Sequence, residues 1–246
     1  MFSLGNKQLV RLMAGTALVL AASIAPASAA TITFDFTGSG GAGSIGNTRT
    51  FTQGGITITA TAWSYGTSFQ PSAVGQYSHG LGVCSSSELS AGCSSPTHET
   101  DNAGGLVDFV LFQFSAPVDP LSVYIQTTSN DDIDASYWTG VITLPADRLK
   151  DDTYADLATR GFGSRLDSDF THTDFTDDFR TVTLTSGSVT GLLFGARYGQ
   201  TDDAFKITSM IIDPTVTTTA VPEPASMMLL GSGLVGIAAR FRRRRA

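Results

Sequence analysis

Apolar and polar residues alternate along most of the middle of the chain. This period of two returns in short runs around Phe34, Ile58, Val123, Val182, Phe194 and Ile207. Successive side chains of a strand point to opposite faces of a sheet, so the pattern predicts half-buried β-strands. Val107–Phe114 is apolar on nearly both faces and is therefore expected to be a central strand, and Tyr137–Ile142 is a further candidate.

Clusters of Gly, Ser, Asn, Asp and Pro separate these runs. Many short strands divided by turn residues are typical of an antiparallel sandwich. The sequence therefore predicts an all-β domain over residues 30–215, an antiparallel β-sandwich of the jelly-roll type. Within it, only Ala146–Arg160 is expected to form a helix, and a short one.

The first 29 residues have the order of a secretory signal peptide. Lys7 and Arg11 carry the positive charges, an apolar run follows over Leu12–Ile24, and Ala27-Ser28-Ala29 has small residues at the positions that precede a cleavage site. An uncleaved membrane anchor is the alternative, but the apolar run is shorter than the roughly 20 residues that span a bilayer. We expect cleavage before Ala30 and export of the mature chain.

The last 31 residues, 216–246, read as a linker followed by a second sorting segment. Val221, Pro222, Glu223 and Pro224 precede an apolar stretch over residues 225–239, and a cluster of arginines follows, namely Arg240, Arg242, Arg243, Arg244 and Arg245. The stretch predicts a short transmembrane helix, and the arginines orient it with the C-terminus in the cytoplasm. A generic tail anchor would have the same order of apolar helix and arginines.

This tail resembles the PEP-CTERM sorting signal of Gram-negative bacteria, in which a Pro-Glu-Pro motif, a short apolar helix and an arginine cluster end the chain. The resemblance implies that exosortase, a membrane-embedded cysteine protease or transpeptidase, processes the chain near Pro222–Pro224. It also implies transient anchoring in the inner membrane, followed by residence at its periplasmic face, on the outer surface or in the extracellular matrix.

Cys84 and Cys93 are the only cysteines, with eight residues between them. In an oxidising compartment such a pair can close a small loop as a disulfide, which would contribute roughly 2–3 kcal/mol. Two metal-binding thiols are the alternative, although no CxxC spacing supports them. We expect the disulfide.

Acidic residues cluster at three places that the strand pattern assigns to loops. Oxygen ligands on loops are what Ca²⁺ takes, and loops distant in sequence meet at one end of a sandwich. We therefore expect a structural calcium site that includes Asp101, Asn102, Asp202 and Asp203, with Asp131–Asp134 as a second candidate. The alternative is a set of solvated loop acids that keep an exported domain soluble. No other cofactor is expected.

The charge balance and the missing motifs limit the function. Between the two sorting segments, residues 30–220 carry 8 basic and 21 acidic residues, a net charge of −13 against −7 for the whole chain. Such a surface repels phosphate backbones, so nucleic acid is not an expected partner. The sequence has no HExxH, GxSxG or GxxxxGK[ST] motif, and we expect no enzymatic activity.

The middle of the chain also resembles an ectodomain that recurs among PEP-CTERM proteins, through Gly80–Val83, His98–Asn102 and Asp203–Ile207. Those domains are mostly uncharacterised, and the resemblance implies a β-sandwich but brings no known activity with it. The leading hypothesis is a surface or matrix protein associated with exopolysaccharide. A carbohydrate-binding module is the alternative, with aromatic platforms drawn from Trp63, Tyr65, Tyr137, Trp138 and Tyr198. A hydrolase with an unrecognised site comes third.

Overall fold

The computed structural model describes residues 30–89, 93, 98–127, 131–143, 149–170 and 179–214. These residues lie in one compact unit, Ala29–Val216. The signal peptide, the Val221–Pro224 motif, the expected transmembrane helix and the arginine cluster fall outside the described residues. Among the residues that are described, no helix is long and apolar enough to cross a membrane.

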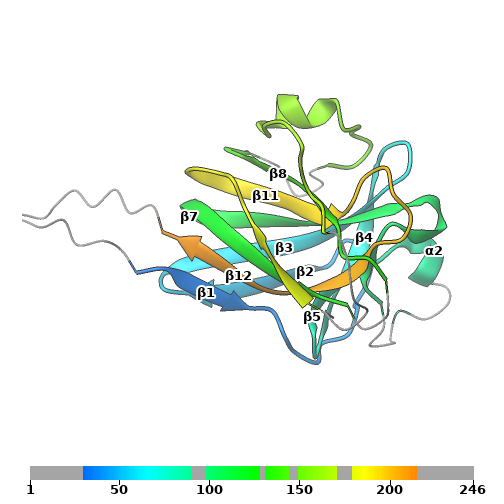
Figure 1. The fold of residues 1–246 in the computed structure, drawn as a ribbon, viewed down its shortest axis with the longest axis horizontal. Helices are drawn as coiled ribbons and strands as arrows, with labels where there is room; N and C mark the ends of the chain where they lie inside the picture. Colours follow the sequence, from blue (N-terminus) through cyan, green and yellow to red (C-terminus); the bar gives the residue numbers. More distant parts are fainter. Residues whose placement is uncertain are drawn as a thin grey trace, which may run out of the picture. The chain divides into compact units, whose positions relative to one another are not determined.

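The described unit is mostly β-structure, as the alternation predicted (Figure 1). Its twelve strands are β1 (Ile32–Asp35), β2 (Thr48–Gln53), β3 (Ile56–Tyr65), β4 (Phe69–Tyr77), β5 (Gly80–Cys84), β6 (Thr100–Asp101), β7 (Val107–Gln126), β8 (Ala135–Gly140), β9 (Leu166–Ser168), β10 (Phe179–Thr183), β11 (Val189–Ala196) and β12 (Ala204–Asp213). The helical turns are short: α2 (Ser86–Leu89), η1 (Ala103–Gly105) and η2 (Asp156–Arg160).

Five strands close into a barrel. Each strand pairs antiparallel with the next in the order β12-β5-β4-β3-β7, and β7 pairs back to β12. The remaining strands extend this ring, with β11, β8 and β9 continuing outward from β7. The all-β prediction is confirmed. The jelly-roll sandwich is not confirmed, because the pairing joins the strands into a closed ring instead of two separate sheets.

The closure depends on β7, which is twenty residues long. Its first part, up to Phe114, pairs with β3 and β11, whereas its second part, from Asp119 onward, pairs with β12 and β10. The partners change around Ser115 and Pro117, which are both exposed. Proline has no backbone N–H to give to a ladder, so it is tolerated where pairing is interrupted. One continuous strand thereby belongs to both halves of the barrel.

Both faces of the first part of β7 are buried, as the sequence predicted. Val110 and Phe112 belong to the main core inside the barrel, whereas Phe109 and Leu111 face a second apolar cluster outside it. Residues of the 149–163 segment cover that second cluster, and Leu149, Leu157 and Phe162 are buried there. Two apolar layers on opposite faces explain why this strand has no alternation.

The segment expected to form a helix is mostly irregular. Its only described helical part is the 3-10 turn η2, which ends at Gly161 in the left-handed conformation, with φ 95°. Backbone hydrogen bonds tie the segment to Phe69 at the start of β4, through Phe69 N to Asp152 O at 2.8 Å and Asp151 N to Phe69 O at 2.9 Å. These bonds to a strand replace those of a continuous helix.

Candidate functional site

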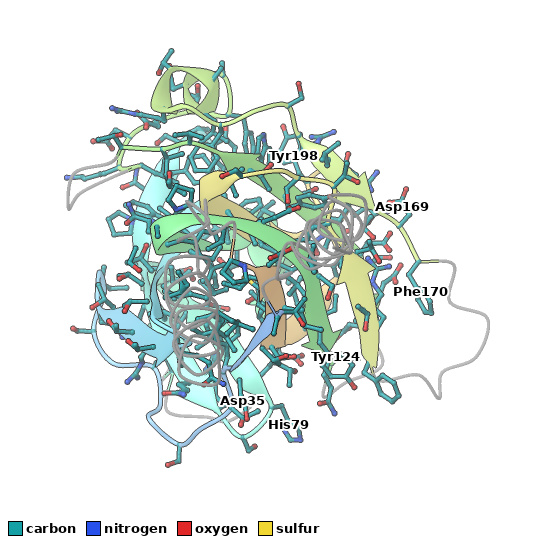
Figure 2. The ribbon with its side chains drawn as sticks, turned by 90° about the vertical axis from the view of Figure 1, so that its left-hand side faces the viewer. Asp35, His79, Tyr124, Asp169, Phe170 and Tyr198 are labelled. Carbon is teal, nitrogen blue, oxygen red and sulfur yellow. A yellow bond between two sulfur atoms is a disulfide. The ribbon has the colours of Figure 1, made fainter. Side chains whose placement is uncertain are left out.

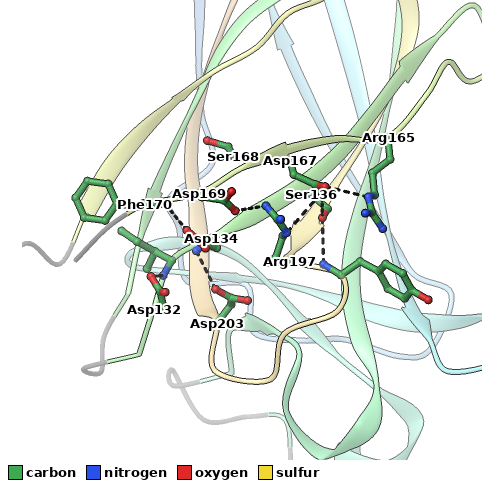
Figure 3. A network of polar contacts seen from close by, with 12 residues as sticks. Asp132, Asp134, Ser136, Arg165, Asp167, Ser168, Asp169, Phe170, Arg197 and Asp203 are labelled. Atoms are coloured by element: carbon green, nitrogen blue, oxygen red, sulfur yellow. Dashed lines mark hydrogen bonds and ion pairs between the residues drawn. The ribbon is translucent and has the colours of Figure 1, made fainter.

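Acidic side chains from two distant segments meet at one end of the unit (Figure 3). Asp134 directly precedes β8, Asp132 lies two residues earlier, and Asp203 directly precedes β12. Asp132 N donates to Asp202 O at 2.9 Å, and Ala204 N donates to Asp132 O at 2.9 Å. These backbone bonds hold the segments together, so one carboxylate oxygen from each of the three aspartates lies within 4.8 Å of the others.

Asp203 is the centre of this acidic cluster, which we define as Asp132, Asp134 and Asp203. Asn102, which follows β6, donates from Nδ2 to Asp203 Oδ2 and accepts from Asp203 N at 2.9 Å. Asp134 N donates to Asp203 Oδ1 at 2.9 Å. With its amide nitrogen facing the carboxylates, Gln200 donates to Asp203 Oδ2 at 3.2 Å and to Asp134 Oδ2 at 3.3 Å. The carboxylate of Asp203 therefore accepts hydrogen bonds from two other segments of the chain and from Gln200 in its own β11–β12 connection.

One buried cation faces the cluster. Arg180 on β10 lies 3.7 Å from Asp134 Oδ1, and both side chains are almost fully buried. Its Nη2 also donates to Ser168 O at 2.7 Å and to Ser168 Oγ at 2.9 Å. Burial lowers the pKa of Arg180, although the aspartates around it oppose that shift. One guanidinium therefore faces three carboxyl groups, and the cluster keeps an excess of negative charge when all three are ionised.

Burial changes the proton affinity of the cluster. Asp203 is 1% exposed. Burial raises its pKa to about 7, against the opposing effects of the hydrogen bonds from Asp134 and Asn102. Burial likewise raises the pKa of Asp134, although the hydrogen bond from Phe170 N and the charge of Arg180 oppose it. Near neutral pH this cluster can therefore gain a proton or a cation at modest cost.

A second polar group surrounds Asp167 on β9, next to the cluster (Figure 3). Asp167 accepts from Ser136 Oγ at 2.6 Å and from Arg165 Nε at 3.1 Å, and Arg197 Nε lies 3.8 Å away. Arg197 also pairs with the exposed Asp169. These contacts link β8, β9 and the end of β11, so they hold together the strands that carry the acidic cluster.

Asp101 belongs to a different place. It lines a cavity of about 190 Å³ together with Glu88, Asp108 and the serines Ser85 and Ser87. Asp108 is 2% exposed and accepts a short hydrogen bond from Ser64 Oγ. Burial, and then the charge of Glu88, raises the pKa of Asp101 to about 6. Burial, and then Asp101, raises the pKa of Asp108 well above its ordinary value.

The structure thus regroups the predicted calcium ligands. Asn102 and Asp203 do lie together, but Asp101 faces the cavity and Asp202 is exposed, with only its backbone carbonyl bonded to Asp132. Asp132 and Asp134, from the second candidate stretch, lie beside Asp203 instead, whereas Asp131 is exposed. The calcium site stays a prediction, and its best-placed ligands are Asp132, Asp134 and Asp203.

Some residues of these groups were missed in the sequence. Arg180 and Gln200 carry no local signal, because their roles depend on how β10 and the β11–β12 connection fold back onto β8. Asp108 did carry a signal: it is a lone acid in the apolar run Val107–Phe114, and a polar residue within a central strand needs buried partners.

The cysteines and most of the aromatic residues are structural. The structure joins Cys84 to Cys93 in a disulfide, as expected. Trp63, Tyr137 and Trp138 are each less than 5% exposed, so they are core residues and cannot be carbohydrate platforms. Tyr198 is 39% exposed, with the guanidinium of Arg165 5.1 Å from its ring centroid. Tyr198, labelled in Figure 2, is the exposed member of the five candidate platforms and is the best placed of them for a planar ligand.

Fold and site together define a β-barrel domain with a buried carboxylate cluster. The chain also carries a sorting signal outside that domain. The sequence model of the PEP-CTERM protein-sorting motif matches residues 220–244, which contain the Val221–Pro224 motif and most of the arginine cluster. Searches of curated proteins and of solved structures returned no match. The chain therefore carries a PEP-CTERM sorting motif at its C-terminal end, and this motif indicates export and sorting at the cell envelope by exosortase.

Proposed function

We propose that this chain is a non-enzymatic surface or matrix protein of a Gram-negative bacterium. Residues 1–29 direct export and are removed, residues 225–239 hold the chain briefly in the inner membrane, and exosortase then acts near Pro222–Pro224. The observation that carries this proposal is the sorting motif at residues 220–244. Exosortase and the membrane are the partners that it implies.

We further propose that the barrel domain is displayed among exopolysaccharide. Its net negative charge suits an exported, highly hydrated setting, because charge of one sign keeps a domain soluble and dispersed. A structural role agrees with the acidic cluster, in which Asp134 and Asp203 accept hydrogen bonds from the surrounding backbone and side chains. A carbohydrate-binding role is the second candidate, and the exposed Tyr198 beside Arg165 favours it.

The intact mass of the envelope-associated protein tests the sorting proposal. Expressed with its exosortase, the chain should lose residues 1–29 and the arginine-bearing end, and should lack two hydrogens because of the Cys84–Cys93 bridge. Glu223→Ala should retain the arginine-bearing end, since the recognition motif is altered.

Asp35→Ala, an exposed change at the end of β1, is the matched control and should be processed normally. A full-length unprocessed chain recovered from the cytosol would refute the proposal.

A further inference from the structure

Three metal-ligating side chains meet at the end of β5, away from the acidic cluster. The sulfur atoms of Cys84 and Cys93 and a ring nitrogen of His98 all lie within 4.8 Å of one another. Cys84 is fully buried and Cys93 is 3% exposed, whereas His98 is half-buried. The two sulfurs are joined as a disulfide, so a metal could bind all three groups only in the dithiol form.

The position of His98 does not depend on the disulfide. Its carbonyl accepts a hydrogen bond from Lys206 Nζ on β12, and Val83 N on β5 donates to the carbonyl of the next residue, Glu99, at 3.4 Å. Gly82 permits this approach, because a Cβ at that position would lie 2.2 Å from His98 O. Strands β5 and β12 therefore hold the backbone of His98 beside Cys84 through contacts that do not involve the disulfide.

Cys93 also has a contact besides the disulfide. Tyr77 Oη donates to Cys93 O at 3.2 Å. The ammonium group of Lys206 lies 4.5 Å from the centroid of the same Tyr77 ring. Lys206 thus bonds to His98 and also contacts Tyr77, the residue that holds Cys93, so two of the three potential ligands share one support.

We propose that the newly exported dithiol form of this chain binds Zn²⁺ through Cys84, Cys93 and His98, in competition with the disulfide. Thiolate and imidazole are the usual zinc ligands, with Zn–S near 2.3 Å and Zn–N near 2.0–2.1 Å. Two sulfurs on one tetrahedral zinc lie roughly 3.8 Å apart, so the reduced sulfurs must separate from their bonded distance. The ring nitrogen of His98 already lies within 4.8 Å of both sulfurs. Three protein ligands leave the fourth position for water.

The two fates of the dithiol differ in their electron balance. Zinc binding releases the two thiol protons and transfers no electrons. Disulfide formation removes two electrons and two protons from Cys84 and Cys93, which pass to a disulfide-bearing oxidant that becomes a dithiol. Coordination to zinc lowers the nucleophilicity of both thiolates, one of which must attack the oxidant first, so zinc should slow formation of the bridge.

Cobalt titration of the reduced full chain under anaerobic conditions tests the proposal. Co²⁺ should produce a thiolate-to-cobalt charge-transfer band that saturates at one equivalent and disappears when Zn²⁺ is added. His98→Ala should weaken zinc binding at least about tenfold, while air oxidation of this variant still forms the disulfide.

His79→Ala is the matched control, because His79 is exposed and precedes β5 at the strand end opposite Cys84 (Figure 2). This variant should bind zinc as the unaltered chain does.

A second measurement covers the case in which the reduced chain loses its fold. Oxidation of the dithiol by glutathione disulfide should be at least about tenfold slower with zinc present, and His98→Ala should remove most of that protection. The proposal would be overturned if the charge-transfer band were absent. It would also be overturned if His98→Ala and the unaltered chain bound zinc equally well and were equally protected from oxidation.

Discussion

Two buried regions beside β8 differ in the chemistry of their buried side chains. Under the 149–163 segment, the rings of Trp138 and Tyr154 stack with centroids 5.3 Å apart, and Phe109 meets Trp138 at 5.7 Å. At the start of β8, by contrast, the buried groups are Asp134, Asp203 and Arg180. Apolar contacts have the same free energy at any pH, whereas buried carboxyl groups depend on protons and cations. The aromatic region should therefore contribute most of the free energy of unfolding. The acidic cluster should make that free energy depend on pH and on cations.

The largest expected effect lies in the aromatic region. Trp138→Ala should lower the free energy of unfolding by about 3–5 kcal/mol, because it removes a buried ring between Phe109 and Tyr154 and leaves a cavity. Urea unfolding followed by circular dichroism measures this. Trp138→Phe fills much of the cavity and should cost clearly less. A loss below about 1 kcal/mol for Trp138→Ala would show that the segment over this cluster contributes little.

The acidic cluster should make stability depend on pH. The pKa of Asp203 is about 7 in the folded chain, against an ordinary value of 3.8. Between these values the folded state binds more protons than the unfolded state, so stability should fall as the pH rises from about 4 to about 7. The burial-raised pKa values of Asp134 and Asp101 act in the same direction. Thermal melts across this range measure the slope.

Asp203→Asn should flatten that slope, because an amide has no charge to desolvate. Asp202→Asn is the matched control, since this neighbour is exposed, and its slope should be unchanged. If calcium binds here, Ca²⁺ should raise the melting temperature at pH 8 more than at pH 5, and Asp203→Asn should lose this gain. An EDTA-insensitive midpoint at pH 8, unaltered by added Ca²⁺, would exclude the predicted calcium site.

The smallest stability effect is expected at Tyr198, which lies between the two regions. Its ring contacts Tyr154 at a centroid distance of 4.5 Å, and its backbone N donates to Ser136 Oγ at 3.0 Å. Tyr198→Ala should cost about 1 kcal/mol or less, because the ring is partly exposed and the Arg165 contact is weak at a surface.

If the domain binds glycans, Tyr198→Ala should also abolish that binding on an array. Phe179→Ala is the control, since Phe179 is 52% exposed on β10. Equal glycan binding by both variants would remove Tyr198 from the carbohydrate hypothesis.

The sequence predicted individual strands better than their arrangement. Alternation around Phe34 and Ile58, and its loss over Val107–Phe114, depend on local burial and so are visible in the chain. Closure into a barrel depends on the point near Pro117 where β7 changes its partner strands. No local sequence pattern indicates that change. The prediction of a helix over Ala146–Arg160 was wrong for most of its described residues. Leu149 and Leu157 pack onto the sheet, while the backbone of this segment hydrogen-bonds to β4.

The acidic site was predicted in part for the same reason. Clusters of acids identified the right loops, and Asn102 and Asp203 do meet. Which member of each cluster points inward depends on strand register, so Asp101 and Asp203 were paired in the prediction although Asp101 faces a separate cavity. The charged partner, Arg180, comes from a strand with no distinguishing pattern.

The antiparallel pairing of β1 with β12 has a mechanical consequence. These are the first and last strands of the domain, and β12 also pairs with β7 over most of its length. Pulling on the C-terminal end of β12 along the strand direction would load this pairing lengthwise. The hydrogen bonds of β12 to both neighbours would then have to slide and break together instead of opening one by one. Such a shear geometry resists pulling.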